Sequence, residues 1–158
     1  MVLARIQMWL VLLLGVLGVA EPPAPRAGEE TVRICVVAIV ATDRDNLVDH
    51  RLRCIAKEVQ KKEPTLTGFR LVTLNCKPVA VGGKETFKLV EGETATVEVL
   101  QATDEDDRVR LTVKAPLMGE ITYGTCCAKY FPIMTRYQTK EKDRLILAVM
   151  VKPCSAEK

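Results

Sequence analysis

The residues with the greatest chemical potential in this chain are six cysteines and a single histidine, His50. Zinc sites need cysteine and histidine ligands at set spacings, and the sequence contains neither a Cys-x-x-Cys pair nor a His-Glu-x-x-His motif. A nucleophilic cysteine needs a basic partner, but the residues around Cys126 and Cys127 match no cysteine-protease signature. We therefore assign no catalytic residue, no metal ligand and no cofactor. A small thiol-dependent enzyme using Cys126 or Cys127 is kept as an alternative.

The cysteines also indicate how the chain is stabilised. An even number of cysteines in an exported chain favours disulfide bonds, and all six lie beyond residue 20. The Cα atoms of adjacent residues lie about 3.8 Å apart across a trans peptide, which is below the usual range for a disulfide. Cys126 and Cys127 should therefore bond to different partners. Cys35 lies within an apolar segment, so a free buried thiol is an alternative to a disulfide there.

The last two predicted strands suggest a partner for Cys127. If their hairpin turns at 140–141, Ile133 faces Ala148 and Cys127 faces Cys154. We therefore predict a disulfide between Cys127 and Cys154 at the end of this hairpin. A change of one residue in the loop would give that role to the neighbouring cysteine, and the spacing leaves the other pairings open.

The first twenty residues have the composition of a secretory signal peptide. Arg5 supplies a positive charge, 8–19 form an apolar core, and 18–20 form a small-x-small cleavage site. The apolar run is too short to cross a bilayer comfortably. We therefore predict a signal peptide at 1–20, export to the periplasm or the extracellular space, and no transmembrane segment after cleavage.

The rest of the chain predicts one domain with short flanking segments. The stretch EPPAPRAGEE is rich in proline and glutamate and lacks apolar periodicity, which predicts a disordered linker at 21–31. A single domain follows at 32–154, and 155–158 form a flexible tail. The net charge of +3 is too weak for a dedicated nucleic-acid-binding protein, so we expect no nucleic-acid partner.

Apolar periodicity predicts a strand, one helix and then a series of strands. The segment 32–41 is apolar on both faces, as in a strand buried on both sides. The segment 47–62 carries one apolar stripe of helical period, with Asn46 or Asp49 as its N-cap. From Gly68 onward the apolar period is two. The strands predicted there are 69–74, 78–81, 85–90, 94–101, 108–115, 121–123, 130–138 and 144–152.

This order of elements indicates an α+β fold. We predict a mainly antiparallel β-sheet, or a sandwich-like meander, with one N-terminal amphipathic helix. The final strand, 144–152, is apolar on both faces, so we place it centrally in a sheet. The expected product is a β-rich domain stabilised by disulfide bonds.

Aromatic residues gather near the adjacent cysteines and form our candidate contact surface. They are Tyr123, Tyr130, Phe131 and Tyr137. Either they form an exposed patch on the last hairpin, or they form the core seam beneath it. The predicted helix offers a second surface, a row of basic residues that could engage an anionic polymer or lipid head groups, with a solvated helix face as the alternative. This row consists of Arg53, Lys57 and Lys61.

Several segments resemble a group of uncharacterised small exported bacterial proteins. The shared segments are VVAIVATD, VDHRL, GFRLV, GEITYGTCCAKYFPIMTRY and RLILAVMV, within 32–154. The resemblance implies the order of strand, helix and β-meander, and it implies no activity and no site residues.

Without a catalytic pattern, our leading hypothesis is an exported, non-enzymatic binding or interaction domain. We expect its partner to be a protein or an envelope component. The second alternative, besides a thiol-dependent enzyme, is a structural subunit of an envelope assembly that pairs through its edge strands.

Overall fold

The fold is built around β1 (Thr31–Thr42), which corresponds to the apolar run at 32–41. β1 pairs antiparallel with β2 on one side and with β8 on the other. All of its side chains from Ile34 to Ala41 are buried. Because successive side chains of a strand point to opposite faces, β1 must be covered from both sides. The predicted two-sided burial of this strand is confirmed.

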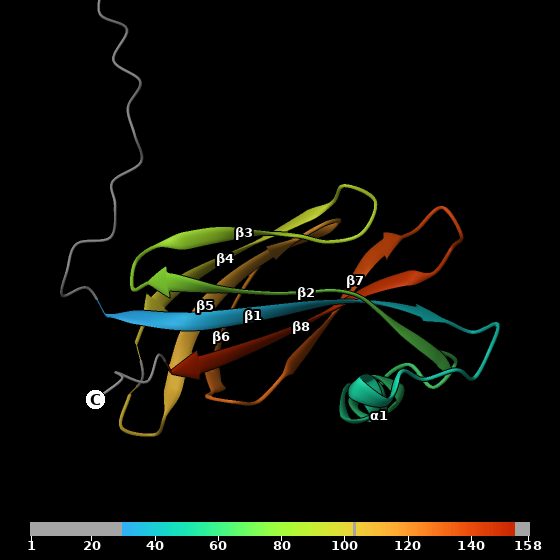
Figure 1. Cartoon of the computed structure of the whole chain (residues 1–158), viewed down its shortest axis with the longest axis horizontal. Helices are drawn as coiled ribbons and strands as arrows, with labels where there is room; N and C mark the ends of the chain where they lie inside the picture. Colours follow the sequence, from blue (N-terminus) through green and yellow to red (C-terminus); the bar gives the residue numbers. More distant parts are fainter. Residues whose placement is uncertain (1–29, 103, 154–158) are drawn as a thin grey trace, which may run out of the picture.

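The computed structural model describes residues 30–102 and 104–153 and arranges them in two four-stranded antiparallel sheets (Figure 1). The first sheet has the strand order β2-β1-β8-β7 and the second has the order β3-β4-β5-β6. The predicted fold class, mainly antiparallel β-sheet with one helix near the start, is confirmed. The elements after β1 are the 3-10 helix η1 (His50–Leu52), α1 (Arg53–Gln60), β2 (Gly68–Ala80), β3 (Lys84–Lys88), β4 (Thr94–Gln101), β5 (Arg108–Ala115), β6 (Met118–Cys126), β7 (Phe131–Gln138) and β8 (Arg144–Pro153).

The two sheets pack face to face and bury one continuous apolar core between them. The even-numbered residues of β1 from Val32 to Ala38 face this core. β8 contributes alternate residues in the same way, from Leu145 to Val151. The opposing residues of the second sheet include Phe87, Val97, Val99, Val109, Leu111 and Val113, all fully buried.

The helical segment covers the other face of the first sheet at one end. Ile55 and Val59 of α1 pack with Ile39 of β1 and Ile146 of β8. Figure 1 shows α1 on the side of this sheet that is away from β3 and β4. β1 and β8 therefore lie between two apolar layers, and the predicted central position of the final strand is confirmed.

The helix begins later than the predicted 47–62 because the chain before it pairs with β2. The amide of Phe69 donates to the carbonyl of Leu47, and the amide of Asp49 donates to the carbonyl of Phe69. These bonds hold the chain extended at 47–49. Asp49, one of the two predicted caps, accepts a hydrogen bond from the Arg51 amide at 3.0 Å and so caps η1.

β2 is one uninterrupted strand, which corrects the predicted break near Pro78. Pro78 lies opposite Arg33 of β1, within the paired region. β2 is an edge strand, so a residue without an amide donor is tolerated there. β6 is likewise longer than the predicted 121–123, because its pairing with β5 continues almost to both ends.

A disulfide joins Cys35 of β1 to Cys76 of β2, directly across the strand pair. The two Cα atoms are 4.0 Å apart, and Cys35 is 1% exposed. Of the two alternatives left open for Cys35, the structure therefore has the disulfide and not the free buried thiol. Sequence spacing missed this pair because it depends on the register between β1 and β2, which is set by packing on the helix and the second sheet.

The last hairpin has a different register from the predicted one. Ile133 lies opposite Leu147, not Ala148. The cause is an irregularity in β7, where Thr135 donates a hydrogen bond to the carbonyl of Leu145 at 2.7 Å and accepts one from the amide of Tyr137. Extra residues of β7 are accommodated in this bulge, which a uniform hairpin does not include.

Several predictions concern segments outside the described residues. They are the signal peptide at 1–20, most of the linker at 21–31, the tail at 155–158, and the Cys127–Cys154 disulfide, since Cys154 is not described. In the described part of the chain, no helix is long and apolar enough to span a membrane. The disulfide between Cys35 and Cys76 suggests an oxidising compartment.

We predict that replacing both Cys35 and Cys76 with alanine lowers the free energy of unfolding by about 3–4 kcal/mol. The bond closes a loop between residues 41 apart in sequence, and that loop restricts the unfolded chain. Urea denaturation without reductant measures the change. Cys54→Ala, at an exposed helix position, is the control and should leave the midpoint unchanged. Equal midpoints for the double variant and the native chain would show that this bond does not form.

Candidate functional site

A groove of about 570 Å³ lies between α1 and the chain that leads into β7. Its volume is in the range of small-molecule binding sites, about 300–1,000 Å³. The greater part of its lining is apolar. It is larger than two other hollows on the described surface, which have volumes of about 180 and 350 Å³.

One wall of the groove comes from the helical segment. Ile55 and Val59 belong to the buried stripe of α1 and form the base. Cys54, Glu58 and Lys62 follow one another at intervals of four residues, so they lie along one side of the helix as a rim. The apolar base and polar rim therefore result from the amphipathic pattern of a single helix.

The opposite wall comes from the turn between β6 and β7. Ala128 has a left-handed backbone with φ of 62°, and its amide donates to the carbonyl of Val151 at 2.7 Å. The chain then enters β7 with Tyr130, Pro132 and Met134 facing the groove. Tyr130 and Met134 also pack against the core beneath α1, so this wall is held in place from below.

Lysine side chains surround the carboxylate of Glu58 in the groove rim. Lys61 Nζ lies 2.7 Å from Glu58 Oε1. This hydrogen bond and the positive charges of Lys61, Lys129 and Lys62 lower the pKa of Glu58. One negative charge thus meets three positive ones, and the rim has an excess of positive charge that favours an anion.

The structure separates the four aromatic residues predicted as a contact surface. Tyr130 and Phe131 line the groove, and Phe131 is 40% exposed. Tyr123 of β6 stacks against Phe131 with ring centroids 4.2 Å apart. The Tyr123 hydroxyl is buried and has no hydrogen-bond partner among the described residues, and burial raises the pKa of Tyr123. Tyr137 lies at the far end of β7, away from this group.

Tyr137 joins the two sheets at their other end. Its hydroxyl donates to Glu91 Oε2 at 2.7 Å, and the amide of Lys140 donates to Glu91 Oε1 at 2.9 Å. The hydrogen bond to the Glu91 carboxylate raises the pKa of Tyr137 to about 12. Tyr137 therefore links the β3–β4 loop to the β7–β8 hairpin and takes no part in the groove.

The adjacent cysteines lie where β6 ends. Cys126 is exposed, whereas Cys127 is half-buried and packs against the sandwich core. Neither is bonded to another described cysteine. The described residues contain no cluster of three or more histidine, cysteine or acidic side chains that could hold a metal ion. His50 is exposed and lies beside Asp49, with 3.6 Å between His50 Nδ1 and Asp49 Oδ1.

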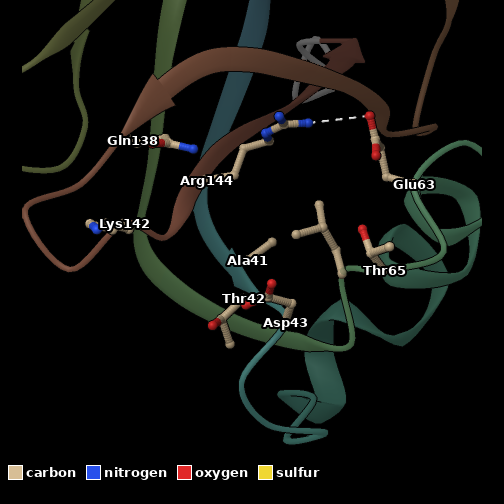
Figure 2. Close-up of a pocket in the computed structure, with 9 residues that line it drawn as sticks. Ala41, Thr42, Asp43, Glu63, Thr65, Gln138, Lys142 and Arg144 are labelled. Carbon is tan, nitrogen blue, oxygen red and sulfur yellow. Dashed lines mark hydrogen bonds and ion pairs between the residues drawn. The ribbon is translucent and has the colours of Figure 1, made fainter.

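A smaller polar pocket of about 180 Å³ lies where the β7–β8 hairpin meets the segment after α1 (Figure 2). In Figure 2, Arg144 of β8 reaches toward Glu63, and their Nη1 and Oε1 atoms are 3.2 Å apart. Thr42 and Asp43, at the end of β1, lie on the opposite side. Two of the four charged side chains that line this pocket, Arg144 and Glu63, are therefore paired with each other.

Asp143, next to this pocket, connects three parts of the chain. It is 2% exposed, and its carboxylate accepts hydrogen bonds from Arg44 and Arg70. Arg44 follows β1 and Arg70 lies in β2, so the hairpin is tied to both strands. A buried carboxylate needs such partners, which makes this cluster structural.

Sequence reasoning found one wall of the groove and missed the other. Tyr130 and Phe131 were candidates, but Cys54, Glu58 and Lys62 were not predicted as part of any site. The sequence did contain one signal for the missed wall. The apolar stripe of the segment 47–62 predicts a helix that packs against one face of a sheet. Which strand would lie beside it depends on contacts between residues far apart in the chain.

Comparisons with protein-family models, curated proteins and solved structures find no match to this chain. The strand, short helix and antiparallel strands implied by the sequence resemblance are present in the fold.

We predict that Glu91→Gln lowers the pKa of Tyr137 from about 12 toward the usual value near 10, because the charged acceptor is lost. Absorbance titration of the phenolate measures this, with Tyr137→Phe identifying which transition belongs to this residue. Because the folded-state pKa is raised, the stabilisation is present below about pH 10 and is lost as the pH rises toward 12. Superimposable titration curves for Glu91→Gln and the native chain would contradict the assigned hydrogen bond.

Proposed function

We propose that this protein is an exported, non-enzymatic binding domain whose groove holds a single acyl chain ending in an acidic head group. Such amphiphiles belong to the class of envelope components expected from the sequence. The observation that carries the proposal is the groove between α1 and β7, with an apolar base and a positively charged rim.

The base of the groove suits an aliphatic chain. Ile55, Val59, Pro132 and Met134 supply apolar contacts, and Met adapts its shape to an irregular ligand. Phe131 adds an aromatic side chain that is 40% exposed. Burying an apolar chain against these groups is favourable by roughly 25 cal/mol per Å² of apolar surface removed from water.

The rim suits an acidic head group. Lys62 and Lys129 lie on opposite walls, one on the helical segment and one in the turn before β7. Glu58 is already paired with Lys61, so its carboxylate offers less repulsion to an incoming anion than an unpaired carboxylate would. The exposed Arg53 and Lys57 on the same helix extend the positive potential toward an approaching ligand.

Binding is preferred to thiol-dependent catalysis because the groove is formed by two packed elements with complementary properties. Cys126 and Cys127, in contrast, lie at the end of a strand, and neither thiol is hydrogen-bonded to an acidic or basic side chain in the described residues. A catalytic thiol needs such a partner to lower its pKa.

The test is calorimetric titration with dodecanoate below its micelle-forming concentration. We expect saturable binding, weaker binding of hexanoate because less apolar surface is buried, and weaker binding of dodecyl maltoside because its head group is neutral. The double variant Lys62→Glu and Lys129→Glu should weaken dodecanoate binding about tenfold.

Two further variants distinguish groove binding from adsorption elsewhere. Met134→Glu places a charge in the apolar lining and should abolish binding, while circular dichroism confirms that the chain is folded. Lys84→Glu, at an exposed position of β3, removes the same type of charge far from the groove and should change affinity less than twofold. Absence of binding to dodecanoate, or equal binding by the Met134→Glu variant, would overturn the proposal.

A further inference from the structure

The two sheets have four edge strands, and three of them are closed to further pairing. An open edge strand offers unpaired amides and carbonyls to any extended chain, so proteins usually block such edges. β2 and β7 are the edges of the first sheet, and β3 and β6 are the edges of the second. The residues of each edge strand show whether it can still pair with another strand.

β2 and β3 cover one another along one side of the sandwich. Lys77 Nζ of β2 donates to the carbonyl of Thr86 in β3 at 2.6 Å. Thr73 and Asn75 of β2 both donate to the carbonyl of Lys88, at 3.3 and 3.4 Å. Two outward carbonyls of β3, those of Thr86 and Lys88, are therefore already occupied, and β3 spans only five residues.

β7 is blocked by its own sequence. Pro132 has no amide to donate, and the strand leaves regular pairing between Met134 and Gln138. Bulges and prolines are two of the devices by which an edge strand is made unsuitable for pairing.

β6 has no proline and no described side chain of a neighbouring strand bonded to its outer carbonyls, and its one irregularity in pairing lies at its start, between Met118 and Glu120. It is nine residues long, contains no proline, lysine or arginine, and carries a single charge at Glu120. Its register with β5 is regular from Glu120 to Cys126. Gly119, Thr122 and Gly124 are exposed. From Glu120 onward, β6 is therefore the one regular edge that remains open to pairing in the described part of the fold.

We propose that this edge is a homodimer interface in which β6 pairs antiparallel with β6 of a second copy. The register centred on the strand has its two-fold axis at Thr122 and pairs the regular residues from Glu120 to Gly124 with their counterparts. The two four-stranded sheets would then form one continuous eight-stranded sheet. This inference is independent of the groove, which lies between α1 and β7.

The register is self-complementary on the face that points into the core. It places Ile121 of each copy opposite Tyr123 of the other, and both side chains are only partly buried within one copy. Pairs of an aromatic and a β-branched residue are favourable across antiparallel strands. Dimerisation would thus complete the burial of this edge of the core.

The register is also self-complementary on the outer face. Thr122 meets Thr122 of the second copy, extending the contact in which Thr112 and Thr122 hydroxyls lie 2.9 Å apart. Glu120 meets Gly124 of the second copy. Gly124 has no side chain and lies opposite Arg110 within its own copy, so Arg110 can reach across it toward the Glu120 carboxylate.

This charge pattern favours a second copy over an unrelated strand. Within one copy Glu120 lies opposite Lys114, and in the dimer it would lie between Lys114 and Arg110 of the other copy. Lys114 and Arg110 of the other copy would then lie about three strand spacings apart, roughly 14 Å, with the Glu120 carboxylate between them on each side of the axis. No two like charges lie directly opposite each other in this register.

The test is the introduction of a negative charge at Gly124, measured by sedimentation equilibrium. A side chain at Gly124 meets nothing within 4 Å, so Gly124→Glu should fold, and circular dichroism checks this. In the dimer the new carboxylate of each copy lies opposite Glu120 of the other copy. The interface therefore contains two pairs of like charges that repel each other. We expect the native chain to dimerise and the variant to dissociate at least tenfold more readily.

Adding Glu120→Lys to Gly124→Glu should restore the dimer, because opposite charges then face each other. Thr94→Glu is the matched control, since it adds the same charge to the same face of the sheet away from β6. A native chain that stays monomeric at submillimolar concentration would overturn the proposal. So would a dimer that Gly124→Glu leaves intact.

Discussion

Burial of β1 on both faces is the constraint on which the rest of the structure depends. A strand whose odd and even residues are all apolar cannot be satisfied by a single packing partner. The second sheet covers the even-numbered side chains, and the helical segment covers Val37, Ile39 and Ala41. The helix is thereby held at one end of the first sheet, where it forms one wall of the groove and faces the chain that enters β7.

The covalent and polar links reinforce this arrangement at its ends. The disulfide fixes β1 to β2, while Asp143 connects the last hairpin to Arg44 and Arg70. Glu91 connects the second sheet to the same hairpin through Tyr137. The groove walls are thus attached to elements that are themselves held from several directions, which limits the reorganisation that a ligand would have to induce.

The local sequence pattern was enough to predict those strands in which buried and exposed side chains alternate regularly along the chain. The alternation in Arg108–Ala115 and Thr94–Gln101 predicted both strands with their observed bounds. The predicted start of the helix was wrong because Val48 pairs with Phe69, a contact between residues far apart in the sequence. The predicted register of the last hairpin was wrong because the bulge at Thr135 satisfies a backbone carbonyl through a side-chain hydroxyl. The Cys35–Cys76 disulfide was not predicted because it depends on the register between two strands, which sequence spacing does not give. Only the aromatic wall of the groove could be predicted, because the position of the helix beside it also depends on contacts between residues far apart in the sequence.

The most direct measurement of the central claim is native-state hydrogen exchange of the backbone amides. If β1 is enclosed by both layers, its amides from Ile34 to Ala41 should exchange only through global unfolding, more slowly than those of α1 and β6. Exchange of these β1 amides at the rate of the α1 amides would contradict the account, because it would show that β1 opens without unfolding the domain.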